Sequence, residues 1–343
     1  MNKSLRIGFV LLSLGAVLHS RAFAVDLTDP AAGDKVAQET KCGDGLEEYR
    51  NGPGWTFRAG GLIMTRTQPD DAVLVTNSFS PGGAELLNAS EFDFGFAGGF
   101  EIDAIRHNVF GTSWDPEFRL FSLDGWNAQS DSVSSPSGAV VQYVIPIGNL
   151  QFTNNIAASL ASELQSVEVN LRRQTRDWLT LLAGFRYVQL NERGLAILQD
   201  VGPGLNLATH AIDADNHLWG CQLGADATVF EFGRLQLGAI GKAGIYSNDC
   251  GNRVAVTQTE GPGFGSNSRD DHVAFVGELG ATGNYAITER WSARAAYQLF
   301  WVDGVALASD QVAVSDPANG SATVDSSGTA FYHGVFAGLE YSR

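Results

Sequence analysis

Hydrophobic and polar residues alternate with a period of two over the long stretch from His272 to Asp303. One face of its first half carries Val273, Phe275, Gly277, Leu279, Ala281, Gly283 and Tyr285. After a short polar break at residues 287–290, one face of the second half carries Trp291, Ala293, Ala295, Tyr297, Leu299 and Trp301. Because side chains alternate across a pleated strand, this stretch predicts two antiparallel strands joined by a turn.

The length and chemistry of these two strands indicate that they cross a membrane. Strands of soluble proteins usually have about 5–6 residues, whereas a tilted membrane-spanning strand needs roughly 9–11. The apolar face has aromatic residues near both ends, at Tyr285, Trp291 and Trp301, as is typical where a lipid-facing band meets the two headgroup layers. The opposite face is small or polar, with isolated charges at Glu278 and Arg294. The sequence therefore predicts a transmembrane β-hairpin.

Similar strand patterns recur along the rest of the chain. They cover Trp55–Ile63, Phe92–Ile102, Pro116–Trp126, Leu164–Arg173, Trp178–Leu190, Asn216–Phe230, Arg234–Tyr246 and Phe331–Tyr341. Short turns join these segments on one side and long loops join them on the other, which is the layout of bacterial outer-membrane barrels. We predict an all-β fold, a transmembrane antiparallel up-and-down β-barrel of about ten strands with short periplasmic turns and long extracellular loops. Twelve strands are expected instead if Val140–Ile147 pairs as an extra hairpin.

The first residues have the features of a secretory signal peptide. Lys3 and Arg6 form a positive segment, residues 7–18 an apolar core and Ala22-Phe23-Ala24 a cleavage motif. About twelve apolar residues are too few to span roughly 30 Å of hydrocarbon. We predict a signal peptide at residues 1–24 that is cleaved near Ala24, a periplasmic N-terminal extension at 25–53 and an outer-membrane barrel at 54–343.

Composition narrows the possible partners and cofactors. The chain of 343 residues has a formal net charge of −16 and a pI near 4.7, which argues against nucleic acid as a partner because phosphate binding needs clustered Lys and Arg. The three cysteines, Cys42, Cys221 and Cys250, show no metal-ligand spacing, so we expect no metal and no cofactor. Cys221 falls on an apolar strand face and is interpreted as a small hydrophobic residue. A bridge between Cys42 and Cys250 is not expected, because it would join opposite ends of the barrel.

The inward faces of the predicted strands gather charges of both signs. They are Arg58, Asp93, Glu101, Glu168, Arg172, Arg186, Asp226, Lys242, Glu278, Arg294 and Glu340. Buried charges are costly unless they pair, so a mixed set is what a filled interior would use. Barrels of about eight strands are filled by side chains, while wide aqueous channels have roughly 16–18 strands. We expect a structural charge network in the lumen, and the alternative is a narrow path for small solutes or ions.

Two acidic pairs suggest a second class of function. Asp213 and Asp215, and Asp270 with His272, are predicted where strands emerge into the outer loops. Facing each other across a barrel mouth, they could activate water as in the omptin-type outer-membrane proteases, which are also ten-stranded. The same loops could instead bind Ca²⁺ through oxygens or mediate surface adhesion. Asp is also a common turn residue, and neither pair lies in an omptin-like sequence, so we expect no enzyme activity.

The segments that follow the first three strands carry a family resemblance. They are Ser166–Asn191, Asn216–Asn248, Val273–Gln311 and Tyr332–Tyr341. Together they resemble the outer-membrane β-barrel proteins abundant in planctomycetal bacteria, which are related to porin-like pore-forming proteins. The resemblance implies one barrel in the outer membrane and no catalytic residues. Such barrels commonly end on an aromatic residue that the assembly machinery reads, whereas this sequence ends Tyr341-Ser342-Arg343. The expected role is a structural envelope component or a narrow porin-like channel, with outer-membrane lipid and the barrel-assembly machinery as partners.

Overall fold

The structure is a computed structural model that describes residues 54–77, 84–130, 133–134, 141–144, 152–199, 206–259, 263–316 and 319–343. The predicted signal peptide, the N-terminal extension and Cys42 lie outside the described residues. No helix in these ranges is both long enough and apolar enough to cross a membrane.

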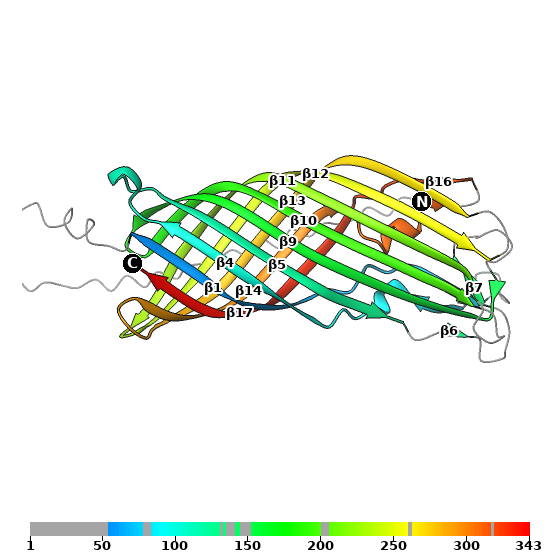
Figure 1. Cartoon of the computed structure of the whole chain (residues 1–343), viewed down its shortest axis with the longest axis horizontal. Coiled ribbons are helices and arrows are strands. Elements are labelled where there is room, and N and C mark those ends of the chain that lie inside the picture. The colour runs from blue at the N-terminus through cyan, green and yellow to red at the C-terminus, as the bar shows by residue number, and fades with distance from the viewer. Residues whose placement is uncertain are drawn as a thin grey trace, which may run out of the picture. The chain divides into compact units, whose positions relative to one another are not determined.

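Ten antiparallel strands form a closed barrel (Figure 1). They are β1 (Trp55–Arg66), β4 (Phe96–Arg106), β5 (Asp115–Gln129), β9 (Asn155–Arg176), β10 (Leu179–Gln199), β11 (Asn206–Phe232), β12 (Leu235–Gln258), β13 (Phe264–Ala286), β14 (Trp291–Val305) and β17 (Gly328–Ser342). Each pairs with the next in this order, and β17 pairs with β1 to close the ring. The predicted ten-stranded up-and-down barrel is confirmed.

The alternative of twelve barrel strands is wrong. Residues 141–143 form β7 (Val141–Tyr143), which pairs with β2 (Val73–Asn77) and β8 (Phe152–Thr153) rather than with a barrel strand. With β3 (Glu85–Asn88) these strands make a separate four-stranded sheet, which we call the cap sheet. The short β6 (Val133–Ser134) adds only two residue pairs at the edge of β9.

The strands have unequal lengths. Strands β9 to β13 have 21 to 27 residues, whereas the other five have 11 to 15. Much of the chain predicted as long outer loops is therefore continued strand, for example residues 206–215 at the start of β11. The opposite end has the short turns between β9 and β10, β11 and β12, and β13 and β14 (Figure 1). The longer strands β9 to β13 therefore extend the barrel wall on one side, at the end away from these turns.

The outward face of the barrel has an apolar band of membrane thickness. On β14, Trp291 and Trp301 both point outward, Trp291 being among the exposed large side chains. Ten residue steps between them correspond to about 33 Å along the strand and about 25 Å along the barrel axis at a tilt of about 40°. That height is the one expected for the lipid-facing band of an outer-membrane barrel.

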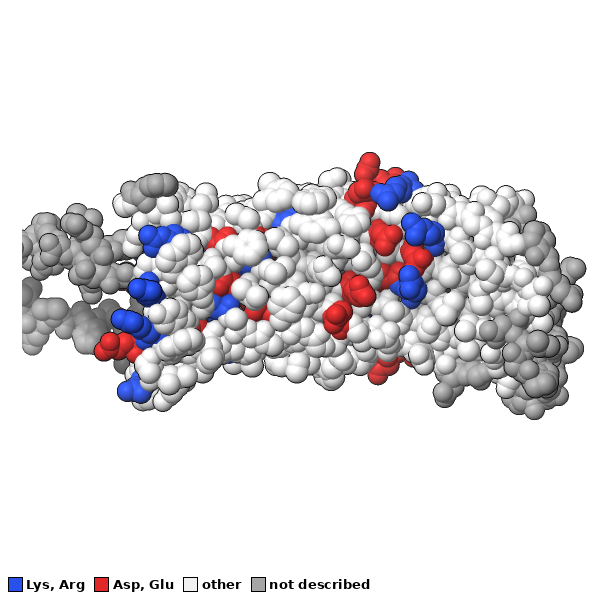
Figure 2. Space-filling model, in the orientation of Figure 1, with Lys and Arg blue, Asp and Glu red and all other residues white. Residues whose placement is uncertain are grey.

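Charged side chains form a belt on the outer wall beyond this band, as Figure 2 shows. Within the belt, the outward charged positions of strands β9 to β13 are Glu163, Arg193, Asp213, Asp215, Asp249, Arg253, Arg269 and Asp271. Two exposed ion pairs lie here, Arg193–Asp213 at 2.6 Å and Arg269–Asp249 at 3.3 Å. Because charges avoid the hydrocarbon region, this belt marks the extracellular edge of the membrane band.

The extracellular half of the barrel is filled by chain that folds into its mouth. The cap sheet packs Val75, Leu87 and Tyr143 against the barrel interior. The segment that follows β14, which we call the mouth loop (residues 306–316 and 319–327), buries Ala306, Leu307 and Ala308 almost completely. The core of this fold therefore lies inside the barrel.

Candidate functional site

A layer of buried ion pairs crosses the middle of the lumen. Arg119 on β5 donates hydrogen bonds to Glu101 of β4 at 2.8 Å, to Glu168 of β9 at 2.9 Å and to Glu278 of β13 at 2.7 Å. All four side chains are at most about a tenth exposed. One guanidinium therefore links three carboxylates on three other strands.

Two more cations complete this central layer. Arg186 Nη1 donates to Glu278 Oε2 at 2.9 Å, and Lys242 Nζ donates to Glu168 Oε2 at 2.8 Å. Gln222 also donates to Glu168 at 2.7 Å. With Arg119, three cations therefore face the three carboxylates, which is the pairing that buried charges require.

A second layer lies closer to the periplasmic end. Arg58 bonds Asp103 at 2.9 Å and Glu340 at 2.7 Å. Arg172 bonds Glu117 and, at 2.7 Å, Asp226. Below this layer is a polar vestibule of about 280 Å³, lined by residues that include Arg58, Arg172, Arg294 and Asp226.

The structure brings ten of the eleven predicted lumen charges to the barrel interior, and Asp93 is the exception. Arg294 belongs to the ten, and it donates to Asn284 at 3.1 Å. Asp93 precedes β4, is exposed and accepts a hydrogen bond from the backbone of Gly95. Gly95 has φ +59°, a left-handed conformation that interrupts the strand alternation. Phe92 and Phe94 are consequently buried instead of facing lipid, and the prediction for Asp93 is wrong.

Sequence reasoning missed three charged residues of the two layers. They are Asp103, Glu117 and Arg119. Glu117 and Arg119 lie on β5, where outward Phe118 and Leu120 alternate with inward Phe121 and Leu123. Because both faces of this strand are apolar, its hydrophobic pattern did not identify the inward face. The signal that was available is the pair of charges itself, two residues apart in an otherwise apolar strand.

An apolar layer of aromatic side chains packs inside the lumen on the extracellular side of the ion pairs. Phe121 and Phe300 pack edge to face with ring centroids 5.7 Å apart, and Trp126 lies 5.2 Å from Tyr332. The Trp126 indole donates to the backbone oxygen of Met64 at 3.1 Å. Above it, Arg66 pairs with Glu192, a buried ion pair between β1 and β10.

The predicted protease residues lie on opposite faces of the barrel wall. Asp213 and Asp215 point outward on β11, and Asp213 pairs with the exposed Arg193. Asp270 and His272 belong to the inward face of β13, on the register of Glu278, and are exposed because β14 ends below them. The structure therefore does not bring the two pairs together. Among the described residues, no group of three or more His, Cys, Asp or Glu side chains could hold a metal ion.

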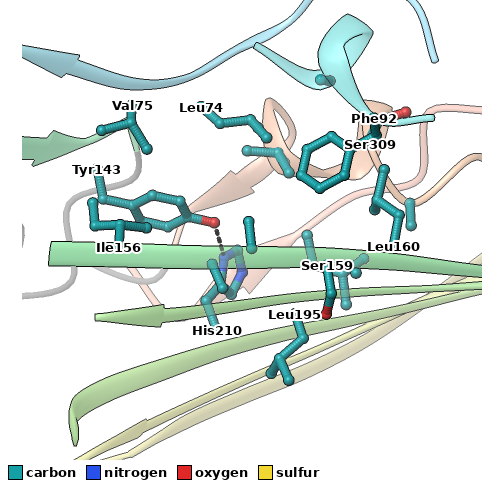
Figure 3. Close-up of a pocket in the computed structure, with 17 residues that line it drawn as sticks. Leu74, Val75, Phe92, Tyr143, Ile156, Ser159, Leu160, Leu195, His210 and Ser309 are labelled. Atoms are coloured by element: carbon teal, nitrogen blue, oxygen red, sulfur yellow. Dashed lines mark hydrogen bonds between the residues drawn. The ribbon is translucent and has the colours of Figure 1, made fainter. Parts of the chain in front are cut away.

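A small pocket lies between the cap sheet, the mouth loop and strands β9 to β11 (Figure 3). Its volume is about 30 Å³, and most of its lining is apolar. Tyr143 of β7 and His210 of β11 meet there, with 2.9 Å between the hydroxyl and Nδ1. Neither residue was predicted from sequence. Of the two cysteines in the described ranges, Cys221 is exposed and Cys250 is buried, and both are free thiols.

Comparisons with solved structures find outer-membrane barrels. The outer-membrane protease OmpT from Escherichia coli is 10% identical over 85% of this chain and 97% of that chain, with a TM-score of 0.45. The toluene transporter TbuX from Ralstonia pickettii is 11% identical over 86% and 90%, with a TM-score of 0.37. The toluene transporter TodX from P. putida is 13% identical over 87% and 92%, with a TM-score of 0.35. Similarity this low carries no argument about activity. No curated protein matches the chain.

A family model matches more than half of the chain. It spans residues 137–326 and is described as "Putative beta barrel porin-7 (BBP7)". The match covers strands β9 to β14 and the mouth loop, which are the segments that carry most of the resemblance seen in the sequence. Taken with the closed ten-stranded ring, it shows that this chain, an outer-membrane β-barrel, belongs to the beta barrel porin-7 (BBP7) family.

Proposed function

We propose that this protein is a closed-lumen structural component of the outer membrane, without enzymatic activity. The observation that carries the proposal is the contact of Arg119 with Glu278, whose strands lie on opposite sides of the ring. Because these side chains meet in the middle of the lumen, a solute cannot pass between them without breaking the bond. The bonds from Arg186 and Lys242 cross the half of this layer that β9 to β12 line. In the other half, Gln298 of β14 donates to Glu101 of β4 at 3.1 Å.

Energetics support closure over an open pore. A solute path through the central layer would separate buried ion pairs, and removing one partner of such a pair typically costs about 3–5 kcal/mol. Beyond that layer the path would also have to displace Phe121, Phe300 and Trp126, which are buried to 3% exposure or less. A barrel of ten strands is only slightly wider than those that side chains fill completely.

A narrow channel for small solutes or ions is the second candidate. The polar vestibule of about 280 Å³ at the periplasmic end favours it, because the vestibule is large enough for water and leaves Arg58 and Asp226 of the lower ion layer partly exposed. Such a channel would require rearrangement of the central layer. Outer-membrane lipid along the apolar band and the barrel-assembly machinery are the partners that we propose in either case.

Single-channel recording in planar bilayers distinguishes the two candidates. We expect the folded mature protein to give no reproducible conductance steps, with heat-denatured protein as the control. A double variant, Arg119→Ala with Glu278→Ala, removes the bond across the lumen and provides the matched comparison. Discrete steps from the unmodified barrel would overturn the closed-lumen proposal and favour the channel.

A further inference from the structure

The described residues contain three Tyr–His pairs in which a tyrosine hydroxyl meets histidine Nδ1. They are Tyr143–His210 at 2.9 Å, Tyr187–His217 at 2.7 Å and Tyr297–His333 at 2.9 Å. In each of the last two pairs, the tyrosine and the histidine lie on neighbouring barrel strands and face outward. Tyr143–His210 is different, because it joins the cap sheet to the barrel wall and both side chains are buried (Figure 3).

His210 lies in surroundings that favour a neutral imidazole. It is 1% exposed, and its Nε2 has no hydrogen-bond partner. The pocket that it lines takes residues from β2, η1 (Ala89–Glu91), β7, β9, β10, β11, the mouth loop and η4 (Asp310–Val312). None of these lining residues is Asp, Glu, Lys or Arg, and Tyr143 is the other titratable side chain among them.

Of the charged groups on adjoining elements, Glu91 of η1 is exposed, and the more buried ones are engaged elsewhere. Asp310 begins η4, but its carboxylate accepts from Ser309, and its charged neighbours are Asp325, Asp70 and Arg66. Arg66 itself pairs with Glu192. An imidazolium at His210 would therefore be buried without a carboxylate partner, which is unfavourable. His210 lies three residues beyond Asp213 on the extracellular side, outside the membrane band.

We propose that the cap sheet is a lid over the barrel mouth whose docking is released by acid, with His210 as the group that takes up the proton. In the docked state the neutral imidazole is hydrogen-bonded through Nδ1 to the Tyr143 hydroxyl, and its Nε2 is buried. In the released state both nitrogens reach water, so protonation carries no penalty. The central ion layer lies below the pocket, so the lid controls access to the extracellular pocket rather than conductance.

The direction and size of the effect follow from linkage. Burial lowers the pKa of His210 from 6.5 to about 4. A histidine whose pKa is depressed in the docked state favours docking above 6.5 and progressively loses that contribution as the pH falls toward 4. The largest change in the docking equilibrium constant is ten raised to the difference between the released-state and docked-state pKa values of His210, or about 300-fold.

Thiol labelling of a buried cap position tests the proposal. Cys42, Cys221 and Cys250 are replaced by Ala, and Val75, which is 0% exposed in β2, is replaced by Cys. A pyridyl disulfide that reacts at acid pH labels the full mature chain in lipid vesicles, and each rate is divided by the rate for the urea-unfolded chain at the same pH. We expect this ratio to rise by roughly 100-fold between pH 7 and pH 4, where His210 is about half protonated in the docked state, and to approach its limit of about 300-fold only at lower pH.

Matched variants separate His210 from other titrating groups. His210→Gln should abolish the rise, whereas His217→Gln, which removes the outward Tyr–His pair on the same strand, should leave it unchanged. Tyr143→Phe keeps the titrating imidazole but removes its hydrogen-bond partner, so the lid should open at a less acidic pH than in the parent protein. This variant tests the proposal independently if His210→Gln does not fold. A flat ratio in the parent protein, or an equal rise in His210→Gln, would overturn the proposal.

Discussion

Arg119 and Glu278 bond across the full width of the lumen. Their strands, β5 and β13, are five steps apart in either direction around the ring of ten, and Arg119 Nη1 lies 2.7 and 2.9 Å from the two carboxylate oxygens. Neighbouring strands are already joined by backbone hydrogen bonds, so a bond between opposite walls adds a different restraint. It fixes the cross-section of the barrel.

Replacing Arg119 by Leu should therefore destabilise the folded barrel strongly. Glu101, Glu168 and Glu278 would lose their shared cation while remaining buried, and breaking a buried pair in this way typically costs about 3–5 kcal/mol. Urea unfolding in lipid vesicles measures the loss. Arg193→Leu, which breaks the exposed pair with Asp213, is the control and should cost less than about 1 kcal/mol. Equal effects of the two changes would contradict the structural role of the central layer.

Two adjacent glycines at the closing seam should respond differently to the same substitution. A Cβ on Gly60 would lie 2.4 Å from the backbone oxygen of Ala337 on β17, whereas a Cβ on Gly61 meets nothing within 4 Å. Gly60→Ala should therefore force β1 and β17 apart and lower the yield of the compact, SDS-resistant form. Gly61→Ala should fold normally, since its side chain would point toward lipid. Heat-modified mobility on gels compares them, and normal folding of both variants would show that the seam adapts.

The sequence was sufficient for the barrel because lipid imposes a strict alternation. The apolar residues at alternate positions from Trp291 to Trp301 must all face lipid. The residues between them, including Arg294, were therefore predicted correctly to face the lumen. The same logic failed at Asp93, where the left-handed Gly95 reverses the alternation without any sign in the hydrophobic pattern. It also failed at Arg119, because a strand that is apolar on both faces does not reveal which face is buried.

The extracellular interior was not predictable for a different reason. Trp126, Tyr332 and Tyr143 are buried by tertiary contacts between segments far apart in sequence. In a membrane barrel, apolar residues on the inward face look like exceptions to the pattern until the cap sheet and the mouth loop are seen to cover them. Local periodicity carries no information about such coverage.

Asn216 should hold the mouth loop in place. Its amide donates to the backbone oxygen of Ala306 at 2.8 Å and accepts from the backbone nitrogen of the same residue at 2.7 Å. Asn216→Leu leaves these buried backbone groups unpaired, at a cost of about 1–3 kcal/mol for each. We expect faster hydrogen exchange at Ala306 in this variant. Asn267→Leu, on the exposed outward face of β13, is the control, and unchanged exchange in Asn216→Leu would show that packing alone retains the loop.

Asp310 should give the mouth loop a pH dependence opposite in sign to that of His210. Burial, together with nearby Asp325 and Asp70, raises the pKa of Asp310 from 3.8 to about 6. A carboxyl group whose pKa is raised in the folded state favours folding fully below 3.8, and this contribution is lost as the pH rises through 6. Asp310→Asn keeps the shape without the charge, so the variant should gain stability over the parent protein as the pH increases from 4 to 8. Comparing both proteins at each pH cancels the contribution of His210. A constant difference between their thermal midpoints would mean that Asp310 reaches water in the folded barrel and that the mouth loop is less tightly packed than its buried neighbours, Leu307 and Ala308, indicate.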